Sequence, residues 1–310
     1  MIIISGLINI ETNLKIEAFP IPYFPVRYPF FGAHTSVSGV GYNIANAFQT
    51  LGGEPFRFLS LIGNDPQARL VWDALAADGI DGEFVRPLLP ETPQSVILYD
   101  GDGRRQINVD LKNIQEQPYP PDAFAAALNG CALAALCNIN FSRPMLSICR
   151  ERGIPIATDV HALSDLHDPY NRDFLAAADI LFMSHEHLPT DPATWAARLL
   201  EQYHPRVFVI GLGQEGALLA VSGDRFIGRL PAVTARPVVN TIGAGDALFS
   251  AFLHSYLRSA DPYDALKRAT LFAAHKIGET GAAKGFLSEA ALNALYQQHG
   301  AAITFQRCAA

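Results

Sequence analysis

The sequence predicts an α/β fold, with a doubly wound, mostly parallel sheet flanked by helices and a small β-sheet lid. Short apolar runs with the character of strands alternate with segments of helical period, an order typical of βαβ units. Two further segments break this alternation and favour a separate small sheet. At 310 residues the chain can bury one large core, so we expect a single domain over residues 1–310.

The expected strands of the main sheet are apolar along their whole length because helices cover both faces of such a sheet. In chain order they read MIIISGLI, FRFLSLIG, CALAALCNI, IPIATDV, DILFMS and RVFVIGLG. The hairpin-like GALLAVSGDRFIGRL precedes a helical last third. Helical period is found at Asp65–Asp78, Pro192–Tyr203, Ala244–Ser259, Pro262–Glu279 and Ser288–Gln298.

Residues 10–33 and 92–113 are expected to form the lid. Within the first segment, Glu17–Gly32 holds four prolines and six aromatic residues, a composition that forbids a helix and favours an extended edge strand. Within the second, Thr92–Asn113 predicts two strands around an Asp-Gly turn. Aromatic residues on a small exposed sheet need burial, so we expect a homodimer in which two lids clasp each other.

Composition excludes several classes of partner. Charged residues make up 17% of the chain and the formal net charge is -7, so no long basic face is available for a nucleic acid or an anionic membrane. We therefore expect neither as a partner. The chain contains no CxxC spacing, signal peptide or apolar run of membrane-spanning length. A reducing cytoplasm is the expected location.

One stretch, VVNTIGAGDALFSAFL (residues 238–253), combines features that chemistry on phosphate requires. The N–H groups at a helix N-terminus are unpaired and carry partial positive charge, so phosphate is stabilised there when small residues let it approach. Gly243, Ala244 and Gly245 provide that access. Asp246 follows in the first turn, where a carboxylate can accept the proton of an attacking hydroxyl. An ordinary capped helix would explain these four residues alone, so the rest of the chain decides.

NTIGAGD resembles the DTxGAGD motif of the pfkB family of carbohydrate kinases, which have the ribokinase-like fold. SGVGYNIANAFQTLGG (residues 38–53) resembles that family's GGxxxNxAxxxxxLG block, and VIGLGQEGALL (residues 209–219) resembles its TLGxxG strand and turn. The motifs follow the family's order, and the resemblance extends over essentially the whole chain. It implies an ATP-dependent kinase that phosphorylates a hydroxyl of a small sugar or sugar-like substrate.

The same resemblance implies roles for individual residues. Asp246 is the implied catalytic base, and the N–H groups of Gly243, Ala244 and Gly245 are the implied anion hole. The substrate would lie between the lid and the carboxyl ends of the main strands. The residues implied to bind it are Asn9, Glu11, Gly39, Gly41 and Asn43, with Asn140 on the other side.

Two arginines in the second lid segment allow two interpretations. Arg104 and Arg105 either reach a phosphate or carboxylate of the substrate or form a solvated edge that prevents strand pairing, and the second interpretation is favoured.

The nucleotide and the cations are also assigned by resemblance. ATP with Mg²⁺ is implied as the phosphate donor. The residues implied to bind the nucleotide are Ser184, His187, Gly211, Gly213, Gly216 and Ala273. Asn240, Ile242 and Gly281 correspond to loops that bind a monovalent cation, such as K⁺, in many members.

The chain departs from the family pattern in the cation loop and on the nucleotide side. Asn240 replaces the first Asp of DTxGAGD, which removes a negative charge and weakens the expectation of K⁺ activation. Ser184 and His187 stand where Asn and Glu are expected, so a carboxylate that orders magnesium-bound water is missing unless Glu186 replaces it.

The sugar pocket departs from the pattern as well. Glu11 replaces the usual Asp and Ser38 replaces a Gly, so the pocket is reshaped by about one methylene at each place. The identity of the substrate therefore does not follow from any particular sugar kinase.

Two other functions compete with a sugar kinase. A nucleoside kinase of the same fold would be favoured by aromatic residues near the pocket, such as Phe19, Tyr23 and Phe31. A sugar- or nucleotide-binding protein that has lost efficient transfer is suggested by the three replacements at Asn240, Ser184 and His187.

Two further motif-like patterns are set aside. GLGQEG matches a dinucleotide-binding pattern, but another strand rather than a helix follows it. The histidines of residues 161–187 lack the spacing of metal ligands.

Overall fold

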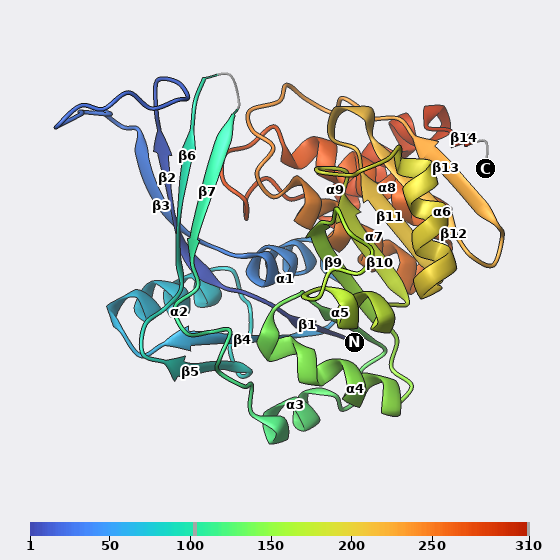
Figure 1. The fold of residues 1–310 in the computed structure, drawn as a ribbon, viewed down its shortest axis with the longest axis horizontal. Coiled ribbons are helices and arrows are strands. Elements are labelled where there is room, and N and C mark those ends of the chain that lie inside the picture. The colour runs from blue at the N-terminus through green and yellow to red at the C-terminus, as the bar shows by residue number, and fades with distance from the viewer. Residues whose placement is uncertain (102–103, 309–310) are drawn as a thin grey trace.

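The computed structural model describes residues 1–101 and 104–308. Among these residues, ten strands form one sheet in the order β14-β13-β12-β11-β10-β9-β8-β1-β4-β5 (Figure 1). All neighbouring pairs from β5 to β11 are parallel, and the pairs from β11 to β14 are antiparallel. The predicted doubly wound, mostly parallel sheet is therefore confirmed.

Each of the six predicted apolar runs contains or overlaps a strand of this sheet, and the predicted hairpin forms β12 and β13. The strands of the main sheet are β1 (Ile2–Ser5), β4 (Phe56–Gly63), β5 (Val85–Leu89), β8 (Leu133–Leu136), β9 (Ile156–Ala162), β10 (Ile180–Ser184), β11 (Val207–Gly211), β12 (Ala217–Val221), β13 (Phe226–Leu230) and β14 (Gln306–Arg307). Their side chains are mostly buried, as expected for a sheet that is covered on both faces.

Helices form a layer on each face of the sheet. The helices are α1 (Val40–Leu51), α2 (Pro66–Ala77), α3 (Pro121–Ala127), α4 (Arg143–Glu151), α5 (Arg172–Ala177), α6 (Pro192–Tyr203), α7 (Ala244–Ser259), α8 (Pro262–Lys276) and α9 (Glu289–His299). One hydrophobic cluster joins one face of the sheet to α1, α2, α7, α8 and α9, and a second joins the other face to the helices from α3 to α6. The five predicted helices are present with ends shifted by at most three residues, the largest shift being at the C-terminus of α8.

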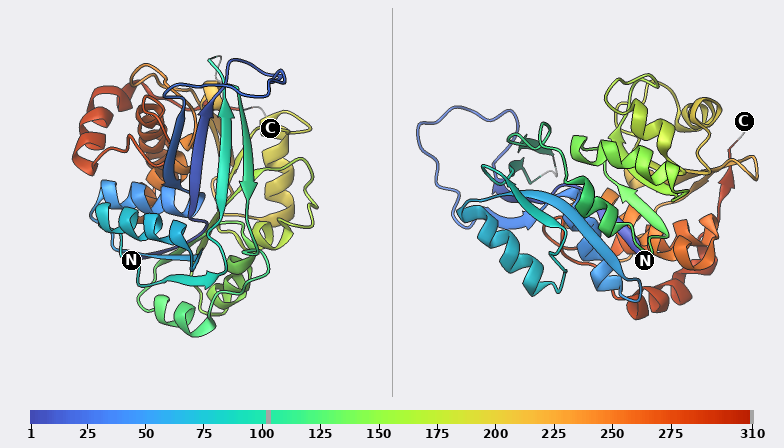
Figure 2. Two further views of the ribbon diagram at one scale, coloured as in Figure 1. Left: turned by 90° about the vertical axis from the view of Figure 1, so that its left-hand side faces the viewer. Right: turned by 90° about the horizontal axis from the view of Figure 1, so that it is seen from below.

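A separate sheet of four strands stands beside the main body (Figure 2). We call it the lid sheet. Its strands are β3 (Ala33–Ser38), β2 (Asn9–Lys15), β6 (Gln94–Tyr99) and β7 (Arg105–Asp110), given in spatial order. The β2/β6 pair is parallel and the other two pairs are antiparallel. The two strands predicted around the Asp-Gly turn are β6 and β7, while Asp102 and Gly103 of that turn lie outside the described residues.

The edge strand predicted over Glu17–Gly32 was wrong. This segment contains no helix, as predicted, but it also contains no strand, and pairing with β2 begins only at Ala33. Its four prolines lack backbone N–H donors, so the segment cannot supply a continuous row of ladder hydrogen bonds. It forms a long loop with exposed aromatic side chains.

Two findings concern the environment of the chain. No helix within the described ranges is long and apolar enough to cross a bilayer. The cysteines Cys131, Cys137, Cys149 and Cys308 are all free thiols in the structure.

Candidate active site

Asp246 and Asn43 meet at the centre of the site although 203 residues separate them in sequence. Asp246 lies in the first turn of α7, and Asn43 lies in the first turn of α1, which packs against α7. The Nδ2 group of Asn43 donates to Oδ2 of Asp246 at 2.6 Å. The structure therefore brings the two most specific sequence motifs together through one hydrogen bond.

Small residues allow α1 to approach the chain between β1 and β2. A Cβ on Gly41 would lie 2.5 Å from the carbonyl carbon of Gly6, and one on Gly39 would lie 2.5 Å from the carbonyl oxygen of Leu7. Gly39 also has a φ of +110°, which side chains disfavour. These two predicted substrate-binding glycines thus act on the path of the backbone, which places Asn43 beside Asp246.

The carboxyl group of Asp246 is half-buried, and its electrostatic environment is mixed. Burial raises the pKa of Asp246 to about 6, and neighbouring Asp159 adds to the rise. The hydrogen bond from Asn43 and the positive charges of His161 and Lys276 act in the opposite direction. The result is a carboxylate that is ionised at neutral pH and is still able to accept a proton.

The turn before α7 has the open geometry that an anion hole needs. Gly243 caps the helix with a φ of +75°, and a Cβ there would lie 2.6 Å from the carbonyl oxygen of Ala282. Beside Gly245, no described atom outside its chain neighbours and the nearby backbone of α7 lies within 4 Å of a hypothetical Cβ. The N–H of Ala244 donates to the carbonyl of Thr241 at 3.2 Å. One of the three predicted donors is therefore already engaged, and the N–H groups at Gly245 and Asp246 are those of a free helix terminus.

Three polar residues alternate along β2 and so share one face of the lid sheet. Asn9, Glu11 and Asn13 are all buried, with Asn9 donating to Oγ of Ser95 at 3.0 Å and Asn13 donating to Oε1 of Glu11 at 2.9 Å. The Oδ1 atoms of Asn9 and Asn13 have no hydrogen-bond partner among the described residues. Buried acceptors without partners are costly, so this row suits a ligand that supplies hydroxyl donors.

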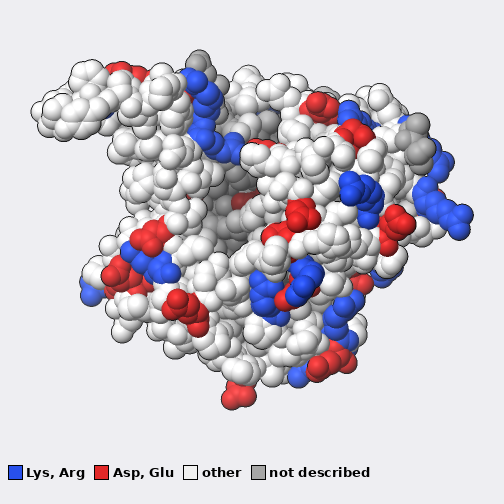
Figure 3. Space-filling model, in the orientation of Figure 1, with Lys and Arg blue, Asp and Glu red and all other residues white. Residues whose placement is uncertain are grey.

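The lid sheet touches the loop that precedes α7. Arg105, the first residue of β7, donates through Nη1 to Oγ1 of Thr241 at 2.6 Å, and Arg104 pairs with Asp100 at 2.8 Å. Figure 3 shows a hollow between the lid sheet and the main body, with acidic atoms on its floor and basic side chains along its upper rim. Arg105 thus reaches across to the loop that precedes α7, an arrangement that neither sequence interpretation included.

The predicted nucleotide residues lie on two neighbouring strand ends and on the turn that follows. Ser184 ends β10 and pairs in register with Gly211 at the end of β11. The N–H and the Nδ1 of His185 each lie 2.9 Å from the carbonyl oxygen of Gly211. This adjacent histidine holds the two ends together, whereas His187 is exposed.

The glycines of the β11–β12 turn differ in their surroundings. Gly213 and Gly216 have positive φ angles of +58° and +95°. A Cβ on Gly216 would lie 2.1 Å from the carbonyl oxygen of Leu230, so only glycine fits there. Ala273, the remaining predicted nucleotide residue, is half-buried on α8, which packs on β12.

The predicted cation ligands surround a lysine. Lys276 is fully buried, and its Nζ donates to the carbonyls of Ile242 and Gly281, the latter at 2.8 Å. Burial lowers the pKa of Lys276 to about 8, although Asp246 and Glu11 favour its charged form. An ammonium group therefore occupies the position that the sequence assigns to a monovalent cation.

Asn140 lies in a short 3₁₀ turn after β8, with its side chain already engaged. Its Nδ2 donates to the carbonyl of Gln115 at 3.0 Å, and its Oδ1 accepts from Arg143 at 3.4 Å.

Sequence reasoning missed four residues that the structure places at the site. Asn13 could have been found by extending the two-residue period of β2 beyond Glu11. Asp159 and His161 lie two residues apart on β9, where the N–H of His161 donates to Oδ1 of Asp159 at 2.8 Å. Lys276 gave no signal, because one lysine at the end of a helix is an ordinary surface pattern.

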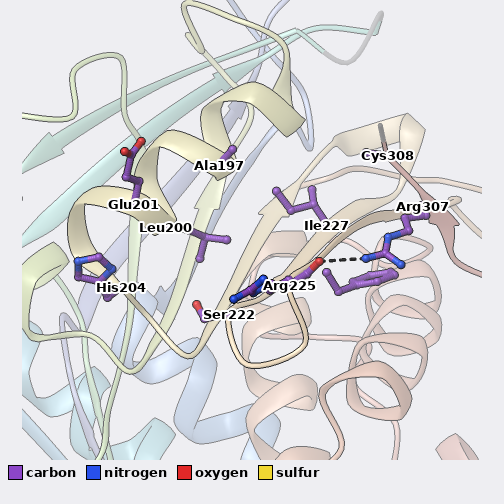
Figure 4. A pocket seen from close by; sticks show the side chains of 10 residues that line it. Ala197, Leu200, Glu201, His204, Ser222, Arg225, Ile227, Arg307 and Cys308 are labelled. Atoms are coloured by element: carbon purple, nitrogen blue, oxygen red, sulfur yellow. Dashed lines mark hydrogen bonds between the residues drawn. The ribbon is translucent and has the colours of Figure 1, made fainter. Parts of the chain in front are cut away.

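A surface pocket lies apart from the site around Asp246, and none of the site residues lines it. It lies between α6 and the β12–β13 hairpin, where Arg307 donates to the carbonyl of Arg225 at 3.0 Å (Figure 4). Within the described residues, no group of three or more His, Cys, Asp or Glu side chains could hold a metal ion.

Comparison with known proteins identifies the family. Residues 6–289 match the model of the pfkB family of carbohydrate kinases. The chain belongs to this family. One curated relative of this pfkB kinase is the acarbose 7(IV)-phosphotransferase of an Actinoplanes species, 25% identical over 94% of this chain and 96% of the relative.

Solved structures share the fold of this pfkB kinase at lower sequence identity. The microbiome-derived acarbose kinase Mak1 matches with a TM-score of 0.85 at 24% identity, over 96% of this chain and 98% of Mak1. The inosine complex of a Burkholderia thailandensis nucleoside kinase gives 0.78 at 20% identity, covering 97% and 99%. Arabidopsis thaliana ribokinase with ribose and ATP gives 0.78 at 20% identity, covering 95% and 97%. These likenesses confirm the predicted ribokinase-like fold.

The raised pKa of Asp246 predicts a stability effect with a definite sign. Because the folded-state pKa lies above the ordinary aspartate value of 3.8, ionising Asp246 destabilises the fold, and this penalty grows as the pH rises from about 4 to about 6. Asp246→Asn removes the penalty and keeps an acceptor for Asn43. We expect the variant to melt a few degrees above the wild type at pH 8, and calorimetry should show the difference shrinking toward pH 4.

Asp224→Asn is the matched control, since Asp224 is exposed and the asparagine amide of the variant can still accept a hydrogen bond from the Tyr263 hydroxyl. Equal melting temperatures for wild type and Asp246→Asn at pH 8 would contradict the assigned environment of Asp246.

Proposed function

We propose that this protein transfers the γ-phosphoryl group of ATP to a hydroxyl of a small sugar or sugar-like molecule, with Asp246 as the general base. The observation that carries this proposal is a half-buried carboxylate, held by Asn43 and placed beside the N-terminus of α7. Family membership supports the reaction class. The residue roles rest on the geometry of the site.

The groups of the site divide the work of the reaction. The carboxylate of Asp246 accepts the proton of the acceptor hydroxyl as its oxygen attacks phosphorus. The N–H groups at Gly245 and Asp246, with the positive end of α7, stabilise the charge on the transferring group. Asn43 keeps the base oriented through its hydrogen bond to Oδ2.

The orphaned acceptors on β2 support a polyhydroxylated substrate. Hydroxyl groups can donate to Oδ1 of Asn9 and of Asn13, and the carboxylate of Glu11 between them can accept from two neighbouring hydroxyls. Two of the three aromatic residues that would favour a nucleoside are almost fully exposed, Tyr23 at 89% and Phe31 at 97%, and Phe19 is half-buried. A sugar is therefore the favoured acceptor, and a nucleoside is the alternative.

Mg²⁺ fits the charge pattern around Asp246. Asp159 lies close enough to raise the pKa of Asp246, and a cation shared with the triphosphate would relieve this repulsion. Asp159 would therefore hold Mg²⁺ together with the phosphates, where the ion would offset negative charge during transfer, and Asp246 stays free to accept the proton. On the nucleotide side, Glu186 is the carboxylate that could order magnesium-bound water in place of the one missing at His187. Its backbone N–H donates to Oγ of Ser184 at 3.2 Å.

Asp246→Asn should abolish phosphoryl transfer while nucleotide binding remains. The amide cannot accept the proton, and we expect kcat to fall by roughly 10²–10⁴-fold. A screen of sugars and nucleosides with ATP, read by ADP release and by mass of the product, identifies the acceptor and measures the loss. In the wild type, kcat should fall below about pH 6 as Asp246 becomes protonated.

Asp224→Asn serves again as the control and should retain full activity. Near-normal transfer by Asp246→Asn would rule out the assigned base. No transfer to any acceptor by the wild type, with ATP still bound, would favour the binding-protein alternative.

Asn13→Ala should weaken binding of the sugar and leave binding of ATP unchanged. Asn13 lies on the buried face of β2 with Glu11, whereas Thr12 on the opposite face bonds to Thr35 across the lid sheet, so Thr12→Ala is a matched control. We expect KM for the sugar to rise about tenfold in Asn13→Ala only, in keeping with one lost hydrogen bond to a buried group. An equal rise in both variants would mean that β2 acts on stability alone.

We also propose a cytoplasmic homodimer that forms through the lid. Free thiols in the described chain suit a reducing compartment. The loop between β2 and β3 exposes many apolar side chains, which a second copy could cover. These are Ile21, Tyr23, Phe24, Val26, Tyr28, Phe30 and Phe31.

Sedimentation velocity at micromolar concentration should give a dimer for the wild type. The double variant Phe30→Ser, Phe31→Ser should be monomeric, because both rings are more than 80% exposed within one chain. A monomeric wild type would remove this proposal.

A further inference from the structure

The Lys276 ammonium joins the two loops that flank the N-terminus of α7. Lys276 is the last residue of α8, and its side chain is fully buried. Its Nζ donates to the carbonyl of Ile242, directly before the Gly243 turn, and to the carbonyl of Gly281, at 2.8 Å, in the loop after α8. One positive charge thus ties the loop of the anion hole to the loop that follows α8.

The oxygen atoms around Lys276 can be compared with those that a separate K⁺ ion would need. A bound K⁺ ion needs a ring of oxygen atoms that replaces its hydration shell. The carbonyls of Ile242 and Gly281 already accept from Lys276, and Oδ1 of Asn240 accepts the N–H of Ile242 at 3.1 Å. The predicted ligands therefore do not fit a separate ion, because the lysine engages two of them and the third is bonded within its own loop.

The surrounding charges compensate one buried cation. A buried ammonium is costly unless acceptors and opposite charges surround it. The carboxylates of Asp246, Glu11 and Glu279 attract the charge on Lys276, and Arg236 opposes it. Arg236 is itself held in place by donating through Nε to the carbonyl of His275 at 2.6 Å.

We propose that the ammonium of Lys276 is a built-in monovalent cation, which makes this kinase independent of K⁺. The inference rests on the proposed phosphoryl transfer at Asp246. Lys276 is a positioning residue, because it acts through the carbonyl of Ile242 on the Gly243 turn and thereby on the N–H groups beyond it. Since the charge is covalently attached, the order of this loop does not depend on the concentration of a free ion.

The first test compares cations on the wild-type protein. Melting temperature and kcat are measured in K⁺ and in choline, each at about 100 mM and equal ionic strength, since an ion that binds only the folded state raises the melting temperature. We expect equal melting temperatures and kcat values that agree within about twofold. Activation by K⁺ of about tenfold or more would overturn the inference while leaving the proposed transfer reaction intact.

The second test removes the ammonium. Lys276→Ala leaves the carbonyls of Ile242 and Gly281 around a space that a small cation can enter. We expect its melting temperature and kcat to be low in choline and to recover in K⁺ or methylammonium. In Lys276→Met the side chain fills the space, so the same cations should restore neither quantity.

Lys267→Ala, on the same helix, controls for the loss of a positive charge and should melt alike in all cations. A Lys276→Ala protein whose melting temperature ignores every added cation would overturn the inference. Because melting is measured without substrate, this result is independent of the proposed transfer reaction, which fails only if no acceptor is phosphorylated.

Discussion

The hydrogen bond from Asn43 to Asp246 is the interaction on which the site depends. It joins the first turns of α1 and α7, which come from opposite ends of the chain. The bond can form only because Gly41 lets α1 lie against the backbone at Gly6. The position of Asn43 is set sterically, because close backbone contact fixes α1. Its effect on Asp246 is electrostatic, because the amide orients the carboxylate and lowers a pKa that burial alone would raise further.

Around this contact the protein balances several charges, of which Asp159 and Lys276 are buried. Asp159 and Asp246 repel one another, whereas Lys276 and His161 favour the ionised form of Asp246. Holding these charges close together costs stability. This cost is expected at a site whose carboxylate must be ionised at neutral pH and still be able to accept a proton. The lid sheet adds the row of acceptors on β2, and Arg105 links this sheet to Thr241 beside the anion hole.

Much of this account could be predicted from local sequence patterns. The apolar runs predicted the main sheet, because a sheet that is covered on both faces needs apolar strands, and the GAGD and Asn43 motifs located Asp246 and its hydrogen-bond partner. The edge strand over Glu17–Gly32 failed because proline blocks ladder pairing. The family resemblance named Ile242 and Gly281 as cation-loop residues, but the role of Lys276 could not be predicted, because how two loops fold together brings their carbonyls to its ammonium group.

The proposed reaction requires Asp246 to be a half-buried carboxylate that can accept a proton near neutral pH. Its titration can be followed directly by NMR on protein labelled with ¹³C at the aspartate carboxyl carbons, with Asp246→Asn used to assign the resonance. We expect an apparent pKa of about 6 for this group. A resonance that titrates near the ordinary aspartate value of 3.8 would show a solvated carboxylate and would contradict the role of Asp246 as a base that accepts a proton near neutral pH.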